Sequence, residues 1–360
     1  MTVKAARRLV FVFSSLIAYS GAFADSDTVS VDCNRGRSIQ EALGKKNADR
    51  PLTVLISGTC NEDVTITRDD VTLSGVGAQV NGTISIVGAR RVVLRALSVS
   101  SPTGNGIFGT GNAAFTVEDS MLERNGTNGV LVRDGAQATL LRNRMAENGT
   151  AGLRDSGRGI EATHGAQVDA SNNVIANNRS DGIAVLNGSY ARLVENTIEG
   201  NGRIDAGESG IQVNRARVRA HANVYRNNTG ISAVQVVNHS DYRTGTGLNT
   251  ADFPDNEFSA FELIEHPVGG GRLAVDVSNS SYGDFRQVDI TGAIGVGAMS
   301  MMQVRGDDVA PNLRCSTITL PPGAGIGVDT RGFLRLRFTR VTPGVPVSPN
   351  IQVNNPCTLP

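Results

Sequence analysis

The chain has 360 residues, and its 34 lysines and arginines balance its 34 aspartates and glutamates, so the formal net charge is zero. This balance excludes the basic surface by which nucleic-acid-binding proteins hold phosphate groups. The composition includes 42 glycines and no tryptophan. It is poorly suited to an ordinary globular core and favours a chain that turns often and stacks small residues.

Residues 1–24 are predicted to be a secretory signal peptide. Lys4, Arg7 and Arg8 precede an apolar run at residues 9–18, and Ala22-Phe23-Ala24 fits a cleavage site. The apolar run falls short of the roughly 20 residues needed to cross a bilayer, so a membrane anchor is the weaker interpretation. Cleavage after Ala24 leaves a net charge of −3. We therefore expect a secreted or periplasmic protein with no membrane span and no nucleic-acid partner.

The first element after the signal peptide is predicted to be a short amphipathic helix within a cap at residues 33–50. Ser38 is placed as its N-cap, with Glu41 at the capping-box position. Strand-like runs with alternating apolar residues follow in three stretches: 53–60, 63–75 and 83–100.

The middle of the chain repeats itself. The recurring step is a glycine followed in most cases by a β-branched residue, and its intervals are 23, 30, 23, 28 and 20 residues. Self-similarity in this range is typical of solenoids. The glycines that mark the repeats are Gly106, Gly129, Gly159, Gly182, Gly210 and Gly230.

Within each repeat the apolar residues alternate with period two, which predicts strands. In the third repeat Ile160 and Ala162 should face inward while Glu161 and Thr163 face outward. The dipeptide "HG" then turns the chain into a second strand. Equivalent turns read "DG" and "NG" in neighbouring repeats, and these residue types tolerate the positive φ of a sharp turn.

Asparagines recur at two further positions in each repeat. Stacked strands lie about 4.8 Å apart, so equivalent amides of successive repeats can hydrogen-bond in a ladder. The first set comes before a third strand, and the second set closes that strand. The first set is Ser120, Asn143, Asn173, Asn196 and Asn223, and the second is Asn125, Asn148, Asn178, Asn201 and Asn228.

Three short strands and three turns per repeat describe one coil of a parallel β-helix, an all-β fold. One coil cannot bury its inner face alone, and its neighbours above and below do so. An open end of such a stack offers unpaired strand edges, which the predicted N-terminal helix should cover. Residues 248–271 break the period and are predicted to leave the stack as a loop. Strands should then resume, and the proline-rich residues 341–360 should form a C-terminal cover.

The four cysteines fall as one pair near each end of the chain, which predicts two disulfides in an exported protein. Three connectivities are open, and pairing each cysteine with its sequence neighbour is the most economical. A zinc site is the alternative, although no C-x-x-C spacing occurs. The cysteines are Cys33, Cys60, Cys315 and Cys357.

The helix, the run "TVLISGTC-NEDVTI" and the coils "GI-x-V-x-x-G … N-x-I-x-x-N" resemble the pectate-lyase-like right-handed β-helices, in particular the carbohydrate-binding and sugar-hydrolase repeat proteins. The resemblance covers most of residues 33–340. It implies one right-handed parallel β-helix, with an asparagine ladder between the second and third strands and a substrate groove along the outer face of the first. It does not imply one activity, because this superfamily holds lyases, hydrolases, epimerases and adhesins, and this chain lacks a DPHD-type epimerase motif.

Two insertions, "GTAGLRDSGR" and "GRIDAGES", emerge directly before first strands and indicate where a site should lie. Carboxylates across a groove could act as general acid and base on a glycosidic bond, or hold Ca²⁺, while arginines bind a uronate. The catalytic candidates are Glu161, Asp155, Asp181, Asp205 and Glu208. The substrate-binding candidates are Arg154, Arg158, Arg133, Gln212 and Tyr190.

Two functions remain open from the sequence. The first is an exported protein that binds a polysaccharide or envelope glycan along its first sheet and acts on it as a lyase, epimerase or hydrolase. The second is a non-catalytic structural or adhesive β-helix of the cell envelope. The clustered insertions favour the first, and the scarcity of aromatics and of family motifs favours the second.

Overall fold

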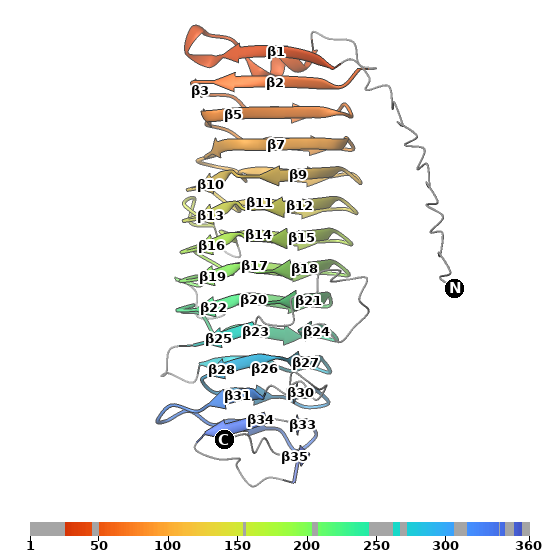
Figure 1. Ribbon diagram of the computed structural model, residues 1–360, viewed down its shortest axis with the longest axis vertical. Helices are drawn as coiled ribbons and strands as arrows, with labels where there is room; N and C mark the ends of the chain where they lie inside the picture. The colour runs from red at the N-terminus through yellow and green to blue at the C-terminus, as the bar shows by residue number, and fades with distance from the viewer. Residues whose placement is uncertain are drawn as a thin grey trace, which may run out of the picture.

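The computed structural model describes residues 26–44, 50–153, 156–203, 208–244, 262–266, 272–305, 315–337, 339–342 and 349–354. These residues form an elongated stack of coils, in which each strand lies above its equivalent in the next coil (Figure 1). Every strand pairing is parallel, and equivalent residues of successive coils are in register. The fold is a right-handed parallel β-helix, as the sequence predicts.

The first strands of the coils form an 11-stranded sheet, called here the first sheet. Its members are β4 (Val64–Ile66), β6 (Ile84–Val87), β8 (Ile107–Thr110), β11 (Val130–Arg133), β14 (Ile160–Thr163), β17 (Ile183–Leu186), β20 (Ser209–Asn214), β23 (Ser232–Val237), β26 (Leu273–Val277), β29 (Ile294–Val296) and β32 (Ile326–Val328).

The second and third strands of the coils make up one sheet of 24 strands, called here the large sheet. The second strands are β1 (Asp27–Asp32), β2 (Leu52–Ser57), β5 (Val71–Val80), β7 (Arg90–Val99), β9 (Ala114–Glu118), β12 (Gln137–Leu141), β15 (Gln167–Ser171), β18 (Tyr190–Val194), β21 (Arg217–His221), β24 (Asp241–Thr244), β27 (Tyr282–Arg286), β30 (Met301–Arg305), β33 (Phe333–Arg337) and β35 (Ile351–Asn354). The third strands are β3 (Thr59–Cys60), β10 (Met121–Glu123), β13 (Arg144–Ala146), β16 (Val174–Ala176), β19 (Thr197–Glu199), β22 (Val224–Arg226), β25 (Glu262–Glu265), β28 (Val288–Thr291), β31 (Ser316–Thr319) and β34 (Thr339–Thr342).

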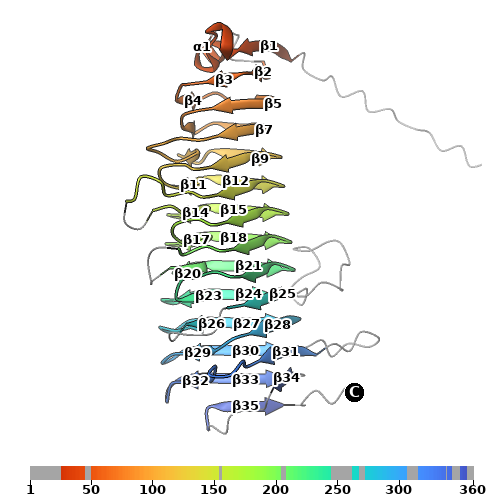
Figure 2. The ribbon, with the colours of Figure 1, turned by 90° about the vertical axis from the view of Figure 1, so that its left-hand side faces the viewer.

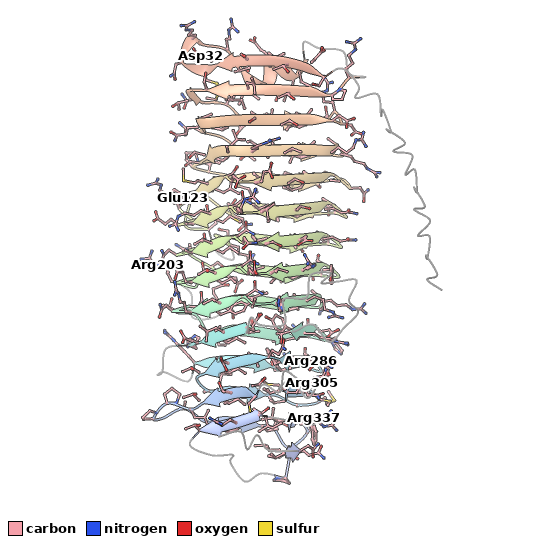
Figure 3. The ribbon with its side chains drawn as sticks, in the orientation of Figure 1. Asp32, Glu123, Arg203, Arg286, Arg305 and Arg337 are labelled. Carbon is pink, nitrogen blue, oxygen red and sulfur yellow. A yellow bond between two sulfur atoms is a disulfide. The ribbon has the colours of Figure 1, made fainter. Side chains whose placement is uncertain are left out.

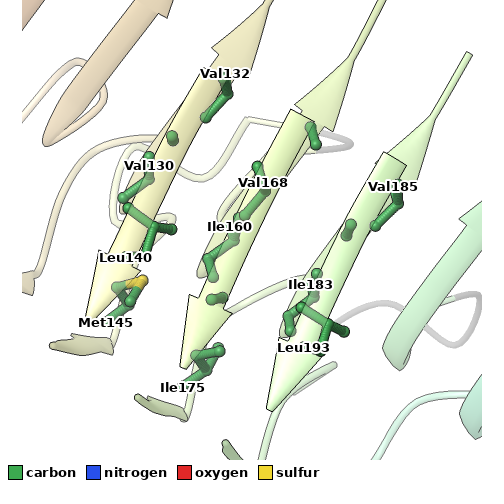
Figure 4. Packing of buried hydrophobic residues seen from close by; sticks show 14 of the residues in the cluster. Val130, Val132, Leu140, Met145, Ile160, Val168, Ile175, Ile183, Val185 and Leu193 are labelled. Atoms are coloured by element: carbon green, nitrogen blue, oxygen red, sulfur yellow. The ribbon is translucent and has the colours of Figure 1, made fainter. Parts of the chain in front are cut away.

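The core runs the length of the stack as columns of like residues. Val130, Ile160 and Ile183 occupy one register position in successive coils, and all are buried (Figure 4). Burying each such side chain contributes about 1.5–3 kcal/mol. Along each strand the outward positions alternate with these inward ones, and many carry polar or charged side chains. Arg305 on β30 and its registered neighbour Arg337 on β33 are examples from the large sheet (Figure 3).

The glycine before each first strand is required by close backbone stacking. A Cβ on Gly159 would lie 2.7 Å from the carbonyl oxygen of Gly182 and 2.4 Å from the Cγ2 of Ile175. The prediction is wrong at Gly230, because the residue in register with Gly210 is Ala233. The true interval there is 23 residues, the same as in two other coils.

Both asparagine ladders are confirmed. The Oδ1 of Asn196 accepts from the backbone N–H of Asn173 at 3.0 Å and from its Nδ2 at 2.9 Å. Asn196 then donates from its own Nδ2 to Asn223 at 2.9 Å. In the second ladder Asn178 donates in the same way to Asn201 at 2.9 Å. The amides therefore hold successive coils together at two of the three corners.

At the N-terminal end, a 3₁₀ turn (η1, Cys33–Arg35) precedes helix α1 (Ile39–Gly44), which lies beside β1 (Figure 2). The Oγ of Ser38 accepts from the backbone N–H of Glu41 at 3.2 Å, as expected of an N-cap. That the helix covers the open end of the stack stays a prediction. The Cys33–Cys60 disulfide is confirmed, with the two Cα atoms 5.0 Å apart. Cys315 is also disulfide-bonded, and its predicted partner Cys357 lies outside the described residues.

The predicted loop at 248–271 is not continuous. Its residues Glu262–Glu265 form β25, which pairs with β22 and β28 in the large sheet. The alternation in "ELIE" places Glu262 and Ile264 inside, so this segment returns to the stack. Within the predicted cover at 341–360, β35 pairs with β33. Residues 1–24, the predicted signal peptide, lie outside the described residues. Among the described residues no helix is long and apolar enough to span a membrane.

Candidate functional site

The outward side chains of the first sheet form one row along the stack. As predicted, Leu131, Glu161, Ala184 and Gln212 occupy one register position in β11, β14, β17 and β20. The pairing continues the row to Gln235 and Asp276. We call these six residues the first-sheet row. Glu161 and Gln212 are two coils apart, which corresponds to about 10 Å.

The residues of the first-sheet row are buried or partly buried. Outward positions of a surface sheet are normally exposed, yet Ala184 is 0% exposed and Gln235 is 9% exposed. Thr163 and Val237, on neighbouring outward positions, are buried as well. The Nε2 of Gln212 donates to the Oε1 of Gln235 at 3.0 Å, which links the two side-chain amides. This face therefore offers polar groups that are held in place and enclosed by their surroundings.

Arg158 is the centre of a buried polar cluster where the first insertion enters β14. Its Nε donates to the Oδ2 of Asp181 at 3.1 Å, and its Nη1 donates to the Oε2 of Glu161 at 3.0 Å. The Nδ2 of Asn128 donates to the same Glu161 oxygen at 2.9 Å. Glu208 interacts with both Asp181 and Arg158. We call these five residues the Arg158 cluster.

Stacking in register brings the Arg158 cluster together. Asn128, Arg158 and Asp181 each come directly before the glycine that opens a first strand, so they stand above one another in successive coils. The Oδ1 of Asn128 accepts from the backbone N–H of Arg158 at 2.9 Å. The Oδ1 of Asp181 accepts from the backbone N–H of Ser209 in the next coil at 2.7 Å. The cluster thus joins the two coils that carry insertions.

Burial dominates the protonation of Asp181. It raises the pKa of this carboxyl group to about 8, with Arg158 opposing the rise and Glu208 adding to it. Burial alone would lower the pKa of Arg158, but the charges of Asp181 and Glu161 outweigh it and raise that pKa above its ordinary value. Arg158 is therefore a fixed cation that is already paired with the acidic side chains of Glu161 and Asp181.

The candidate acids differ in access to solvent. The side chain of Asp181 is 0% exposed, Glu208 is buried, and the side chain of Glu161 retains 15% exposure. Only Glu161 among these three can meet a ligand on the sheet surface without movement of the cluster. Two opposed, accessible carboxylates are what glycosidic hydrolysis requires, and the described candidates do not provide them.

The remaining predicted site residues lie apart. Arg133 on β11 donates to its neighbour Asp134 at 2.9 Å. Tyr190 belongs to β18 of the large sheet and faces a different side of the stack from the first-sheet row. Three candidates lie outside the described residues: Arg154, Asp155 and Asp205.

Sequence reasoning missed Asn128, Gln235 and Asp276 as members of this surface. An asparagine before glycine is ordinary turn chemistry, so the sequence alone does not single out Asn128. Gln235 was lost through the register error at Gly230, and Asp276 follows the segment where the repeat was predicted to break. In the described part of the chain, Cys33, Cys60 and Glu62 bring three metal-ligand side chains close together, but the two cysteines form the disulfide.

Residues 105–264 match the model of the family described as "Right handed beta helix region". Together with the parallel pairing in register, this confirms the resemblance to pectate-lyase-like β-helices at the level of fold. No curated protein matches the chain.

Solved structures with similar coordinates include the mannuronan C-5 epimerase AlgE4 A-module of Azotobacter vinelandii, at 13% identity and a TM-score of 0.49, covering 92% of this chain and 89% of that one. Pectate lyase Pel9A aligns at 12% identity and a TM-score of 0.44, over 93% of this chain and 80% of its own. An alginate lyase from Paenibacillus sp. str. FPU-7 aligns at 15% identity and a TM-score of 0.40, over 87% and 99%.

Proposed function

We propose that the protein is exported and binds a polysaccharide along the outer face of its first sheet, without cleaving it. The observation that carries this proposal is the partly buried first-sheet row. Gln212, Gln235 and Asp276 present planar polar groups in three successive coils, and Glu161 presents another, two coils before Gln212. Planar amides and carboxylates hydrogen-bond the hydroxyl groups of sugars, and a linear row suits a linear chain.

The Arg158 cluster gives the surface rigidity rather than a free positive charge. Arg158 is held by Asp181 and Glu161, so it has little charge left to pair with a uronate carboxylate. Fixing Glu161 from two sides also reduces the entropy lost when a ligand binds. Hydrogen bonding to hydroxyl groups is therefore the chemistry we assign to this row.

Binding should weaken when the paired amides are removed. In the double variant Gln212→Ala, Gln235→Ala, we expect affinity to fall about tenfold or more, since two hydrogen-bonding groups of about 1 kcal/mol each are lost. Affinity electrophoresis of the purified protein in gels containing alginate, polygalacturonate, xylan or dextran measures this. Gln79→Ala removes a comparable amide on β5, away from the first sheet, and should change nothing.

The same polysaccharides test whether the protein acts on its ligand. We expect neither reducing ends nor unsaturated products. Product release that Glu161→Gln abolishes would make the protein an enzyme with Glu161 as its catalytic group. Retention of no polysaccharide in any gel would favour the structural or adhesive function instead.

A further inference from the structure

A second open groove lies on the other side of the stack. It has a volume of about 440 Å³ and follows the outer face of the second strands β7, β9, β12, β15 and β18. Five consecutive strands at about 4.8 Å spacing extend for about 19 Å. We call it the second-strand groove. Its extension along the stack axis suits an extended chain better than a compact small molecule.

Small outward side chains on the first strands of the groove, β7 and β9, line its floor. The small side chains are those of Val93, Ala114 and Thr116. The last strand of the groove carries the larger side chains of Tyr190 and Arg192. Register aligns these positions into two columns. One column is Ala114, Gln137, Gln167 and Tyr190, and the other is Val93, Thr116, Thr139, Asp169 and Arg192.

The groove carries polar side chains with unused hydrogen-bonding capacity. Across the part of the chain that the structure describes, the side chains of Gln137, Gln167, Thr116 and Thr139 make no hydrogen bond. Gln137 and Gln167 are also exposed. These amides and hydroxyls both donate and accept, so they complement the hydroxyl groups of a sugar.

Charge in the second-strand groove is balanced. The Nη1 of Arg192 lies 3.1 Å from Asp169, and Arg91 at the other end is paired with Asp69 and Asp70. Beyond the groove the same face becomes a set of ion pairs, such as Arg219 and Arg243 with Asp241. The uncharged amides and hydroxyls are therefore concentrated where the surface is hollow.

We propose that the second-strand groove binds a segment of an uncharged polysaccharide, with Gln137 and Gln167 hydrogen-bonding its hydroxyl groups and Tyr190 packing against a sugar face. A tyrosine ring offers an apolar surface with a polar tip, which matches the amphipathic face of a sugar ring. This site is separate from the first-sheet row, so different variants test the two proposals.

Affinity electrophoresis with dextran, xylan and galactomannan tests the second-strand groove. The double variant Gln137→Ala, Gln167→Ala should bind the retained polysaccharide about tenfold or more weakly, as expected for two lost hydrogen-bonding groups. Ala114→Arg should block the groove and abolish that binding. Arg217→Ala is the matched control, because Arg217 continues the column of Tyr190 one coil beyond the groove lining. Unchanged thermal midpoints should show that each variant folds.

The possible results separate the two sites. Loss of binding in the groove variants, but not in Gln212→Ala, Gln235→Ala, supports the second-strand groove and overturns the first-sheet proposal. The reverse pattern overturns the second-strand groove. Retention only of alginate or polygalacturonate overturns it too. A change of oligomeric state in Ala114→Arg would overturn it in favour of contact between copies of the chain.

Discussion

Glu262 is a buried acid at the end of the first asparagine ladder. It is 1% exposed, accepts from the hydroxyl of Tyr242 at 2.8 Å and accepts from the backbone N–H of Asn223 at 3.1 Å. Tyr225 and Tyr242 are themselves joined at 3.0 Å. Burial raises the pKa of Glu262 to about 7, although these hydrogen bonds lower it in part. The carboxyl group thus gains a proton more readily in the folded protein than in the unfolded chain.

This shift predicts stability that falls as pH rises. Because the folded pKa of about 7 exceeds the reference value of 4.5, the folded protein binds the extra proton between these values. The ionisation of Glu262 should therefore lower the unfolding free energy by about 3 kcal/mol as the pH rises from below 4.5 to above 7. Glu262→Gln should flatten that slope, as measured by thermal unfolding across this range.

Glu199→Gln is the control for this titration, since Glu199 is an acid on the outside of β19 that pairs with Arg226. A slope that remains in Glu262→Gln is expected from Asp181, whose pKa burial also raises. If Glu262→Gln and the unmodified protein lose stability in parallel, Glu262 does not titrate as described.

At the scale of one element, a turn asparagine serves two coils at once. The Oδ1 of Asn196 receives both donors of Asn173, and its Nδ2 donates to the carbonyl of Ala170 at 2.8 Å. Asn196→Ala leaves these buried groups without partners. Each unsatisfied group costs about 1–3 kcal/mol, so we expect a clear drop in the thermal midpoint. Thr197→Ala, at the next position and partly exposed, should have little effect.

Unchanged stability in Asn196→Ala would mean that water or backbone shifts satisfy the ladder. Hydrogen exchange of the amides of Asn173 and Asn196 reports this directly. Faster exchange confined to that corner is the expected result.

The strands and ladders could be predicted from the sequence because they depend on residue types that recur at one position. Val130, Ile160 and Ile183 occupy the same inward position in successive coils, so the pattern is visible within each repeat of the sequence. Gly230 misled because Gly-Ile occurs there three residues before the Ala-Val that pairs in register. The register is set by the pairing of several consecutive residues, and a single Gly-Ile dipeptide does not determine it.

The candidate site could be predicted only in part. Glu161, Asp181 and Glu208 do gather around Arg158, since register places them together. Their burial could not be predicted, because exposure depends on how the insertions lie over the coil corner. The second-strand groove was missed since its floor comes from small side chains of several separate repeats.

At the scale of the whole molecule, each coil contacts mainly the coils above and below it. Stability in such a stack is a sum of local terms, and damage at one end should stay there. The Cys33–Cys60 disulfide closes a loop of 27 residues near the N-terminal end. Its entropic contribution to stability is about 3 kcal/mol.

Cys33→Ser, Cys60→Ser should therefore loosen the N-terminal coils alone. Hydrogen exchange should speed up in β1, β2 and β3, while β17 and β20 in the middle of the stack keep their protection. Loss of protection along the entire chain would show that the stack unfolds as one cooperative unit, contrary to this expectation.

The first asparagine ladder also has a built-in length. An amide both gives and receives, so a run of asparagines can in principle be extended by any number of repeats. At one end the hydroxyl of Ser120 accepts from the backbone N–H of Leu97, and at the other the carboxyl group of Glu262 accepts from the backbone N–H of Asn223 and, once ionised, has no proton to donate. A duplicated coil could thus extend the ladder between Ser120 and Glu262. A coil added beyond Glu262 would find no side-chain donor there when Glu262 is ionised, so the ladder would not continue into it.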